Sequence, residues 1–339
     1  DMRASPISAS VSFDAEGVQH GHLTLPHSHD FSAWGKIMIP ITVIRNGVGP
    51  TALITGANHG DEYEGPVALQ ELALTLDESA ITGRVIIVPA FNFPAFKAGT
   101  RTSPIDQGNL NRLFPGRPDG SITEKIADYF QRYLLPMADV VLDFHSGGRT
   151  LDFLPFAAAH ILENPAQQAA CVAARNAFNA PFSMMQLEID KTGLYDTAAE
   201  DMGKIFVSTE LGGGGSATAK SIAIAKKGLR NLLIHAEILN APLALEPSVE
   251  IDMPDGDCFT FAAGEGLFEP MVDLGDPVEK GDITARIWPK DHTGRAPEHC
   301  YARRSGILVG RHFPGLIAMG DCATVIAEII GDVDLPDPT

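Results

Sequence analysis

The chain has 339 residues, with 45% hydrophobic and 20% charged residues and a formal net charge of −18 at pH 7. This length suggests two domains, and the acidic balance disfavours binding to nucleic acid or to an acidic membrane surface, since both require a basic face. No apolar run approaches the about 18 residues of a membrane span, and four scattered cysteines without a C-x-x-C pair indicate reduced thiols. Because residues 1–12 hold no secretory signal pattern, we expect a cytoplasmic protein.

Residues 1–35 are rich in Gly, Pro and Ser and predict an N-terminal extension of short strands or loops that packs on the core. Four histidines, His20, His22, His27 and His29, lie there with one-residue gaps. They could form a second metal site, but a solvated strand edge or a subunit contact is the more ordinary interpretation.

Residues 36–245 alternate short apolar runs with helical stretches, which is typical of a largely parallel sheet covered by helices on both faces. We predict strands over residues 39–45, 51–55, 85–89, 140–144 and 205–208, and helices that include residues 65–76 and 123–135. The chain therefore predicts an α/β catalytic domain over 36–245.

The composition changes near residue 246, and residues 246–339 lose the helical pattern. Two similar halves, residues 266–287 and 306–327, each predict two strands joined by a Gly-Asp turn. We therefore expect a small all-β domain of the barrel or sandwich type, which narrows a pocket or supports a homo-oligomer.

His59 and Glu62 lie in a turn that directly follows the predicted strand over residues 51–55 and precedes a predicted helix. Zinc accepts an imidazole nitrogen and a carboxylate oxygen, and a sharp strand-to-helix turn lets two side chains three residues apart converge on it. Such a pair also arises by chance. A second one, His160 and Glu163, has no strand signal before it and is interpreted as an ordinary pair on a helix surface.

His145 supplies a third ligand candidate at the end of another predicted strand. Ligands of open α/β sheets bind outside the carboxyl ends of the strands, where both histidines fall. Asp143, two residues earlier, points to the same strand face. It could orient a ligand or a substrate amine, or it could simply partner a helix N-terminus.

Glu210 ends a further apolar strand and precedes the run Gly212 to Gly215. Two histidines and one glutamate fill three positions on zinc and leave a fourth for water, whose proton an unligated carboxylate can remove. Glu210 fits that role. The glycines remove side chains where a substrate must approach, and because no Lys-Ser/Thr follows, a phosphate-binding loop is disfavoured.

Arg101 and Arg112 lie in the long loop after residue 89. A hydrolase needs a fixed donor for the oxyanion of a tetrahedral intermediate, and a substrate carboxylate suits a bidentate guanidinium. For each arginine alone, a surface salt bridge is the ordinary alternative.

Taken together, these motifs resemble the succinylglutamate desuccinylase and aspartoacylase family of zinc hydrolases, which is related to the zinc carboxypeptidases. The likeness covers about 300 residues in order and spacing. The stretches around His59, Pro104 to Gly116, His145 and Glu210 resemble the branch that contains Nα-acetyl-L-2,4-diaminobutyrate deacetylases of ectoine degradation.

The resemblance implies one Zn²⁺ per chain, held by His59, Glu62 and His145. It further implies that Glu210 is the general base and then acid, that Arg101 polarises the scissile carbonyl, and that Asn111 with Arg112 binds the substrate carboxylate. One departure is Asn109, because relatives have an aspartate there that supports the first zinc histidine. Either Asp106 takes over this task or the histidine is less basic here.

The substrate expected from the resemblance is a small N-acyl amino acid, Nα-acetyl-L-2,4-diaminobutyrate, cleaved to acetate and diaminobutyrate. Five acidic residues could meet its free amine: Asp143, Asp152, Glu188, Asp190 and Asp196. An aspartoacylase-like or desuccinylase-like activity on an anionic amino acid is the alternative, with Lys97, Arg149 or Lys191 as additional cations. A more distant alternative is a non-catalytic zinc-binding or carrier module, prompted by residues 275–282, which resemble one limb of a lipoyl or biotinyl domain without its attachment lysine.

Overall fold

The computed structural model describes residues 3–186 and 190–331. Its helices are α1 (Glu64–Thr75), α2 (Phe93–Ala98), α3 (Ile122–Tyr129), α4 (Pro165–Phe178), α5 (Tyr195–Asp201) and α6 (Ala219–His235). Short 3-10 turns are η1 (Glu78–Ala80), η2 (Leu110–Arg112), η4 (Leu135–Met137) and η5 (Gly256–Cys258), and η3 (Phe130–Leu134) is a π-helical turn that continues α3. No helix in the described ranges is long and apolar enough to cross a membrane.

The strands are β1 (Ser8–Ala9), β2 (Gly17–Pro26), β3 (Lys36–Asn46), β4 (Thr51–Thr55), β5 (Gly83–Val88), β6 (Val140–Asp143), β7 (Leu151–Phe153), β8 (Phe156–His160), β9 (Phe182–Gln186), β10 (Ile205–Glu210), β11 (Val249–Asp252), β12 (Phe259–Phe261), β13 (Gly266–Pro270), β14 (Pro277–Val278), β15 (Ile283–Trp288), β16 (Glu298–Tyr301), β17 (Gly306–His312), β18 (Leu316–Ile317) and β19 (Cys322–Ile329). All five strands predicted from apolar runs are present. The predicted helices correspond to α1 and to α3 with its two following turns.

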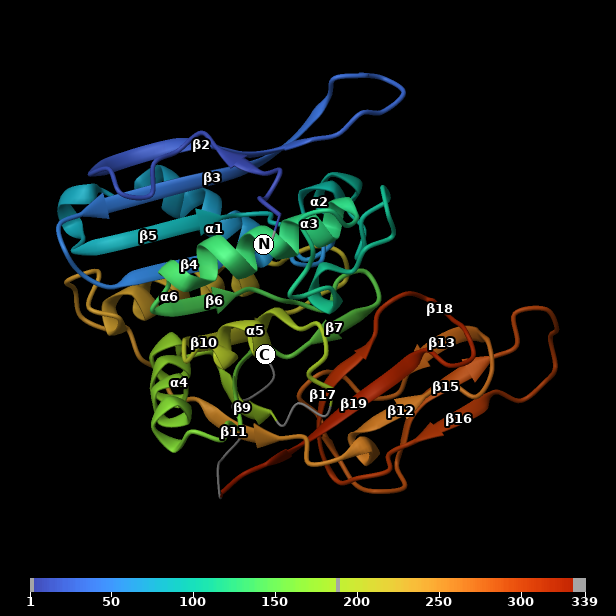
Figure 1. Ribbon diagram of the computed structural model, residues 1–339. Helices are drawn as coiled ribbons and strands as arrows, with labels where there is room; N and C mark the ends of the chain where they lie inside the picture. The colour runs from blue at the N-terminus through green and yellow to red at the C-terminus, as the bar shows by residue number, and fades with distance from the viewer. Residues whose placement is uncertain (1–2, 187–189, 332–339) are drawn as a thin grey trace.

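One large twisted sheet runs through the molecule in the order β1-β2-β3-β5-β4-β6-β10-β8-β9-β11-β19-β17-β14 (Figure 1). Its centre is mostly parallel: β4 pairs in parallel with β5 and β6, and β6 pairs in parallel with β10. The strands β4, β6 and β10 are therefore neighbours whose carboxyl ends meet at one edge. This arrangement confirms the predicted fold class, a mixed, largely parallel sheet with flanking helices.

The central strands bury both of their faces because their side chains alternate between two apolar layers. In β4, Leu53 belongs to the layer that also holds α3 and α5, whereas Ala52 and Ile54 belong to the layer that holds α1, α4 and α6. Each layer covers one face of the sheet, so the strands read as continuous apolar runs. Truncating a side chain such as Leu53 to alanine would cost about 2–5 kcal/mol.

Ser121 begins α3 with a capping box, in which its hydroxyl accepts from the Glu124 amide while the Glu124 carboxylate accepts from the Ser121 amide. Asp106 adds a second anchor, since its carboxylate accepts from the amide and the hydroxyl of Thr123. Capping bonds of this kind stabilise a helix start by about 1 kcal/mol each. The loop that precedes α3, which carries Arg101 and Arg112, is thereby tied to a rigid element.

The C-terminal region forms two packed sheets. β17 and β19 extend the large sheet, while a separate four-stranded antiparallel sheet has the order β16-β15-β13-β18 (Figure 1). The two sequence halves exchange their short strands, because β14 of the first half pairs with β17 and β18 of the second pairs with β13. This small antiparallel sheet confirms the expected β-structure.

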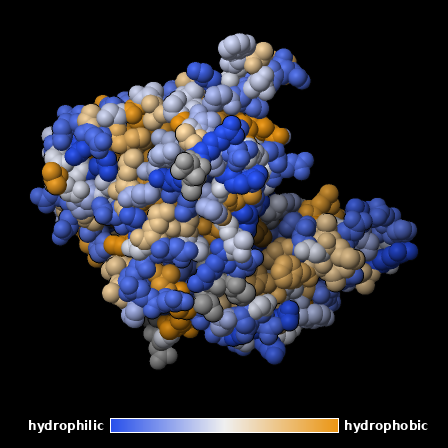
Figure 2. Space-filling view, viewed as in Figure 1, coloured by the Kyte–Doolittle hydropathy of each residue, from blue (hydrophilic) through white to orange (hydrophobic). Residues whose placement is uncertain are grey.

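The division at residues 35 and 245 stays a prediction, although the large sheet crosses both positions. β2 pairs with β3 over ten positions, from Gly17 with Arg45 to Pro26 with Lys36. β11 pairs with β9 on one side and with β19 on the other. The turn between β2 and β3 leaves the body as a projection (Figures 1 and 2), and it carries the exposed side chains of Phe31 and Trp34.

Candidate active site

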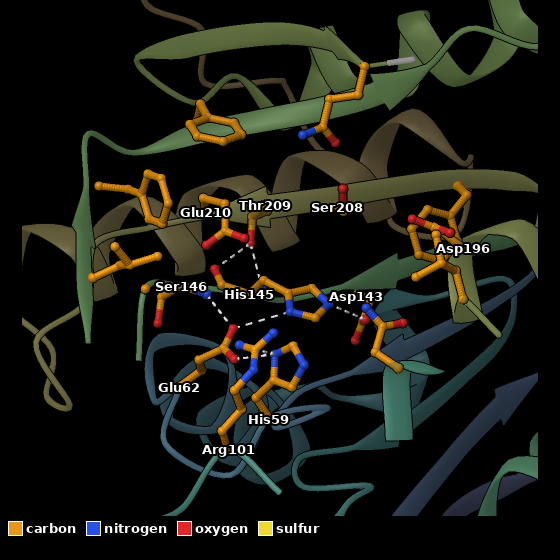
Figure 3. Close-up of a pocket in the computed structure, with 18 of the residues that line it drawn as sticks. His59, Glu62, Arg101, Asp143, His145, Ser146, Asp196, Ser208, Thr209 and Glu210 are labelled. Carbon is orange, nitrogen blue, oxygen red and sulfur yellow. Dashed lines mark hydrogen bonds and ion pairs between the residues drawn. The ribbon is translucent and has the colours of Figure 1, made fainter. Parts of the chain in front are cut away.

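The carboxyl ends of β4, β6 and β10 bring four predicted residues together (Figure 3). His59 and Glu62 follow β4, His145 follows β6, and Glu210 is the last residue of β10. Ligand atoms of His59, Glu62 and His145 lie within 4.8 Å of one another. The convergence predicted from strand ends far apart in the sequence is therefore present.

Both histidines direct Nδ1 at Glu62. His59 Nδ1 lies 2.5 Å from Glu62 Oε2, and His145 Nδ1 lies 3.2 Å from Glu62 Oε1. The Ser146 amide also donates to Glu62 Oε1, at 2.7 Å. The Glu62 carboxylate is thus held between two imidazole rings and accepts a hydrogen bond from the buried backbone of Ser146.

The opposite ring nitrogens are held by acceptors. His59 Nε2 lies 3.2 Å from Asn109 Oδ1, and His145 Nε2 lies 2.6 Å from Asp143 Oδ2. Because an amide oxygen and a carboxylate oxygen only accept, each Nε2 donates, and Nδ1 is the nitrogen left to face Glu62; it carries a proton there unless a cation takes the proton's place and receives the lone pair. Two lone pairs and a carboxylate directed at one point suit a divalent cation such as zinc.

The surroundings of Glu62 show whether a cation fits this site. Within the described part of the chain, Glu62 Oε2 is buried and accepts no hydrogen bond, although it lies against the His59 ring. Burial alone would raise the pKa of the Glu62 carboxyl, but His59 and His145 more than offset this and hold the pKa well below its usual range. Conversely, burial opposes the charged form of His145, while Asp143 and Glu62 raise its pKa well above the ordinary value. The cluster therefore favours a positive charge beside Glu62.

Asp143 is buried and fully engaged. It accepts from the Thr55 hydroxyl at 2.8 Å, from Asn58 Nδ2 at 3.0 Å and from His145 Nε2. No helix begins in residues 144–150, so the interpretation of Asp143 as a helix N-terminus partner is wrong. Asp143 orients His145 instead.

Asn109, and not Asp106, supports His59. Asn109 Oδ1 also accepts from the Asn111 amide at 3.2 Å, whereas Asp106 is occupied at the start of α3. His59 therefore hydrogen-bonds to a neutral amide, whereas His145 hydrogen-bonds to a carboxylate. This asymmetry bears directly on metal affinity.

Glu210 faces the same pocket, and its Oε2 is buried without a hydrogen-bond partner in the described ranges. Burial first, and then the negative charge of Glu62, raise the pKa of Glu210 well above its usual value. Thr209, the residue before it, clamps the His145 backbone by accepting from its amide at 3.0 Å and donating to its carbonyl at 3.1 Å. The backbone before Glu210 is consequently fixed beside the candidate metal ligands, while the Glu210 carboxylate stays available for proton transfer.

The pocket has a volume of about 290 Å³, which suits a small molecule. Arg101, Asn111 and Arg112 line it, and Arg101 Nη1 lies 3.5 Å from His59 Nδ1. Lining residues that the sequence analysis did not single out are Ser146, Gly147, Leu151, Phe153, Phe156, Gln186, Leu194, Phe206, Ser208 and Thr209. They come from several strands and loops and share no motif, so their place depends on the fold.

The glycine run after Glu210 serves packing rather than substrate approach. A Cβ on Gly213 would lie 1.9 Å from the Leu151 carbonyl oxygen, and one on Gly214 would lie 2.7 Å from the Phe313 ring. None of Gly212 to Gly215 is among the described residues that line the pocket. The run lets its loop pass close to β7 and to the C-terminal region.

His160 corrects a further expectation. It is buried at the end of β8, and its Nδ1 lies 3.0 Å from Glu200 Oε2 on α5, so it forms no helix-surface pair with Glu163. With Asp196 and Glu200 it forms the second candidate cation cluster of the described residues. His20, His22, His27 and His29 belong to neither cluster.

Comparison with known proteins agrees with this fold. The succinylglutamate desuccinylase/aspartoacylase catalytic domain matches residues 48–236, which is more than half of the chain. The chain belongs to this family of deacylating enzymes, as the motifs predicted.

Three members of the family are similar to this chain over nearly its whole length. The N-alpha-acetyl-L-2,4-diaminobutyric acid deacetylase of Halomonas elongata is 54% identical over 331 residues, which cover 97% of each chain. The product-bound structure of the ectoine utilization protein EutE (DoeB) from Ruegeria pomeroyi is 66% identical, with a TM-score of 0.95, and the match covers 96% of this chain and 100% of that one. The structure of a succinylglutamate desuccinylase from Silicibacter sp. TM1040 is 65% identical, with a TM-score of 0.96, covering 97% of this chain and 100% of that one.

Proposed function

We propose that the chain is a zinc-dependent amidohydrolase that removes the acetyl group from Nα-acetyl-L-2,4-diaminobutyrate. The observation that carries this proposal is the triangle of His59, Glu62 and His145 in one small pocket with Glu210, whose Oε2 has no hydrogen-bond partner among the described residues. The 54% identity to a deacetylase named for this substrate supports the choice of substrate.

Zinc held by His59, Glu62 and His145 would supply a Lewis acid that activates water and polarises the amide carbonyl. Glu210 takes one proton from the attacking water as its oxygen bonds to the acetyl carbon. Glu210 then delivers that proton to the amide nitrogen as the carbon–nitrogen bond breaks. The products are acetate and the free α-amine of diaminobutyrate, and Glu210 returns to its ionised form.

Arg101 and Arg112 divide two tasks in this proposal. Arg101, beside His59, donates to the oxygen that becomes negative when the carbonyl is attacked. Arg112 and the side-chain amide of Asn111 bind the α-carboxylate. Asn111 Oδ1 already accepts from the Tyr195 backbone amide, so the Asn111 Nδ2 group is left to donate to the substrate. The reacting amide would then lie between Arg101 and Glu210.

The alternative of an anionic amino acid substrate needs further cations near the site. Arg101 and Arg112 are the only lysines or arginines among the described pocket-lining residues, and the lining also includes the acidic Asp196. Lys97, Arg149 and Lys191 do not line the pocket. This balance favours a substrate with one carboxylate.

The alternative of a non-catalytic zinc or carrier module fits the site less well. A structural zinc site closes its tetrahedron with a fourth protein ligand, whereas here three ligand candidates face an open pocket that holds Glu210. The expected cytoplasmic location and homo-oligomer stay predictions. Light scattering in solution tests the second, with the exposed Phe31 and Trp34 as its candidate contact.

Release of acetate from Nα-acetyl-L-2,4-diaminobutyrate by zinc-loaded protein tests the function. N-acetyl-aspartate and succinyl-glutamate serve as anionic comparisons, and Glu210→Gln serves as the inactive variant. Cleavage of the first substrate, lost in the variant, is the expected result. Cleavage of an anionic substrate alone would leave the chemistry in place and overturn the substrate.

A further inference from the structure

Among the described residues that line the pocket, one acidic side chain is not used by the mechanism above. Of the four carboxylates in this described lining, Glu62 and Asp143 contact His145, and Glu210 is assigned to proton transfer. The fourth is Asp196, on α5. Figure 3 shows it on the far side of His145 from Glu210.

The structure distinguishes Asp196 from the other acidic residues that could bind a substrate amine. Asp152 does not line the pocket and lies opposite Arg311 in the pairing of β7 with β17. Asp190 does not line the pocket either and accepts from the Thr192 amide. Glu188 lies outside the described residues. Asp143 is 1% exposed and already accepts three hydrogen bonds.

Asp196 is held firmly. The Thr197 amide donates to its Oδ1 at 2.5 Å, and His160 Nε2 lies 3.5 Å from its Oδ2. His160 is itself fixed by Glu200, one turn further along α5. The Asp196 side chain is 14% exposed, so it reaches the pocket while most of its surface is shielded from water.

The start of α5 is also tied to the proposed carboxylate site. Asn111 Oδ1 accepts from the amide of Tyr195, the residue before Asp196, at 3.1 Å. A site for a carboxylate and a fixed negative charge therefore lie next to each other. A small amino acid that carries an ammonium group on its side chain matches this order of charges, whereas a second carboxylate would be repelled.

We infer that Asp196 binds the side-chain ammonium of the acylated amino acid and thereby makes the enzyme specific for a cationic side chain. This inference rests on the proposed function and adds the residue that selects the substrate. His160 acts through Asp196 as a positioning residue.

The test compares two substrates of equal size. Nα-acetyl-L-norvaline replaces the ammonium group of Nα-acetyl-L-2,4-diaminobutyrate with a methyl group. In Asp196→Asn we expect kcat/KM for the amine substrate to fall roughly 100-fold, because a shielded charge pair loses one partner, and kcat/KM for acetylnorvaline to change less than about threefold. Asp201→Asn makes the same chemical change at an exposed position of α5 and should alter neither value. An equal loss on both substrates in Asp196→Asn would overturn the inference.

Product binding separates this inference from the proposed function. Calorimetry of the zinc-loaded protein with L-2,4-diaminobutyrate and with L-norvaline should show a preference for the amine that disappears in Asp196→Asn. If this preference is found but no acetate is released, the proposed reaction fails and the role of Asp196 stands. If acetate is released and the wild-type protein does not prefer the amine, the role of Asp196 fails and the deacetylase stands.

Discussion

Asn109→Asp should tighten zinc binding, because His59 rests on a neutral amide while His145 rests on a carboxylate. The substitution preserves the geometry: Asn109 Oδ1 accepts from both His59 Nε2 and the Asn111 amide, and a carboxylate oxygen can accept both bonds. Asn109 is partly exposed, so the new charge costs little desolvation.

The magnitude follows from the change in one hydrogen bond. A bond to a charged acceptor contributes about 1.5–3 kcal/mol, compared with about 0.5–1.5 kcal/mol for a neutral pair. A gain of about 1 kcal/mol corresponds to roughly fivefold tighter zinc binding. The reciprocal variant, Asp143→Asn, weakens the support of His145 and should loosen zinc by about 10-fold to 100-fold.

Competition between the protein and a chromophoric chelator measures both affinities without relying on turnover. Circular dichroism of the two variants establishes that each remains folded. Unchanged or weaker zinc binding by folded Asn109→Asp would refute the idea that Asn109 limits the basicity of His59. Tighter binding by Asp143→Asn would refute the whole account of the two supports.

Four further results are expected. Glu210→Gln should lower kcat roughly 1000-fold while zinc stays bound, measured by acetate release and metal analysis, because the residue moves the proton in both steps. Arg112→Ala should raise KM about 10-fold to 100-fold and change kcat less, in steady-state assays; a loss confined to kcat would contradict its role. Burial raises the pKa of Glu64 from 4.5 to about 7. As the pH rises, Glu64 therefore ionises first in the unfolded protein, and the free energy of unfolding should fall by up to about 3 kcal/mol between pH 4.5 and 7. Chemical unfolding should show this slope reduced in Glu64→Gln, and an unchanged slope would contradict the assignment. Removing zinc should lower the melting temperature, since zinc at 100 times its dissociation constant stabilises by about 2.7 kcal/mol.

The centre of the fold was predictable because its strands bury both faces. Residues 51–55, 140–144 and 205–208 are short β-branched or apolar runs, and ligands of an open α/β sheet bind outside the carboxyl ends of such strands, where these runs end as β4, β6 and β10. The gathering of His59, Glu62, His145 and Glu210 was therefore within reach of the sequence.

β8 was not predictable in the same way. Its residues, Phe156 to His160, include three consecutive alanines, and alanine favours helices. The segment is a strand because it pairs with β10 and β9 and is buried on both faces, with Ala157 and Ala158 in different apolar layers. Tertiary packing overrides the local preference there, and for the same reason His160 looked like a surface residue.

The choice among the acids was equally out of reach of the sequence. Asp152, Asp190 and Asp196 are all single acidic residues near predicted elements, and nothing local distinguishes them. What separates them is which backbone segment reaches the pocket wall, and this depends on long-range contacts such as the bond between Asn111 and the Tyr195 amide.

The continuity of the large sheet limits how this protein can be divided or recombined. A chain cut near residue 245 would leave β9 without its partner β11, and β9 would become an unpaired edge. The cut would also uncover Phe182 and Met184, which are now buried against β17 and β19 residues such as Val309 and Val325. Exposed apolar edges recruit other strands, so such a fragment should aggregate. The C-terminal strands β11, β17 and β19 thus belong to the same hydrogen-bonded array as β4, β6 and β10, whereas the four-stranded sheet lies outside this array and should tolerate more substitution.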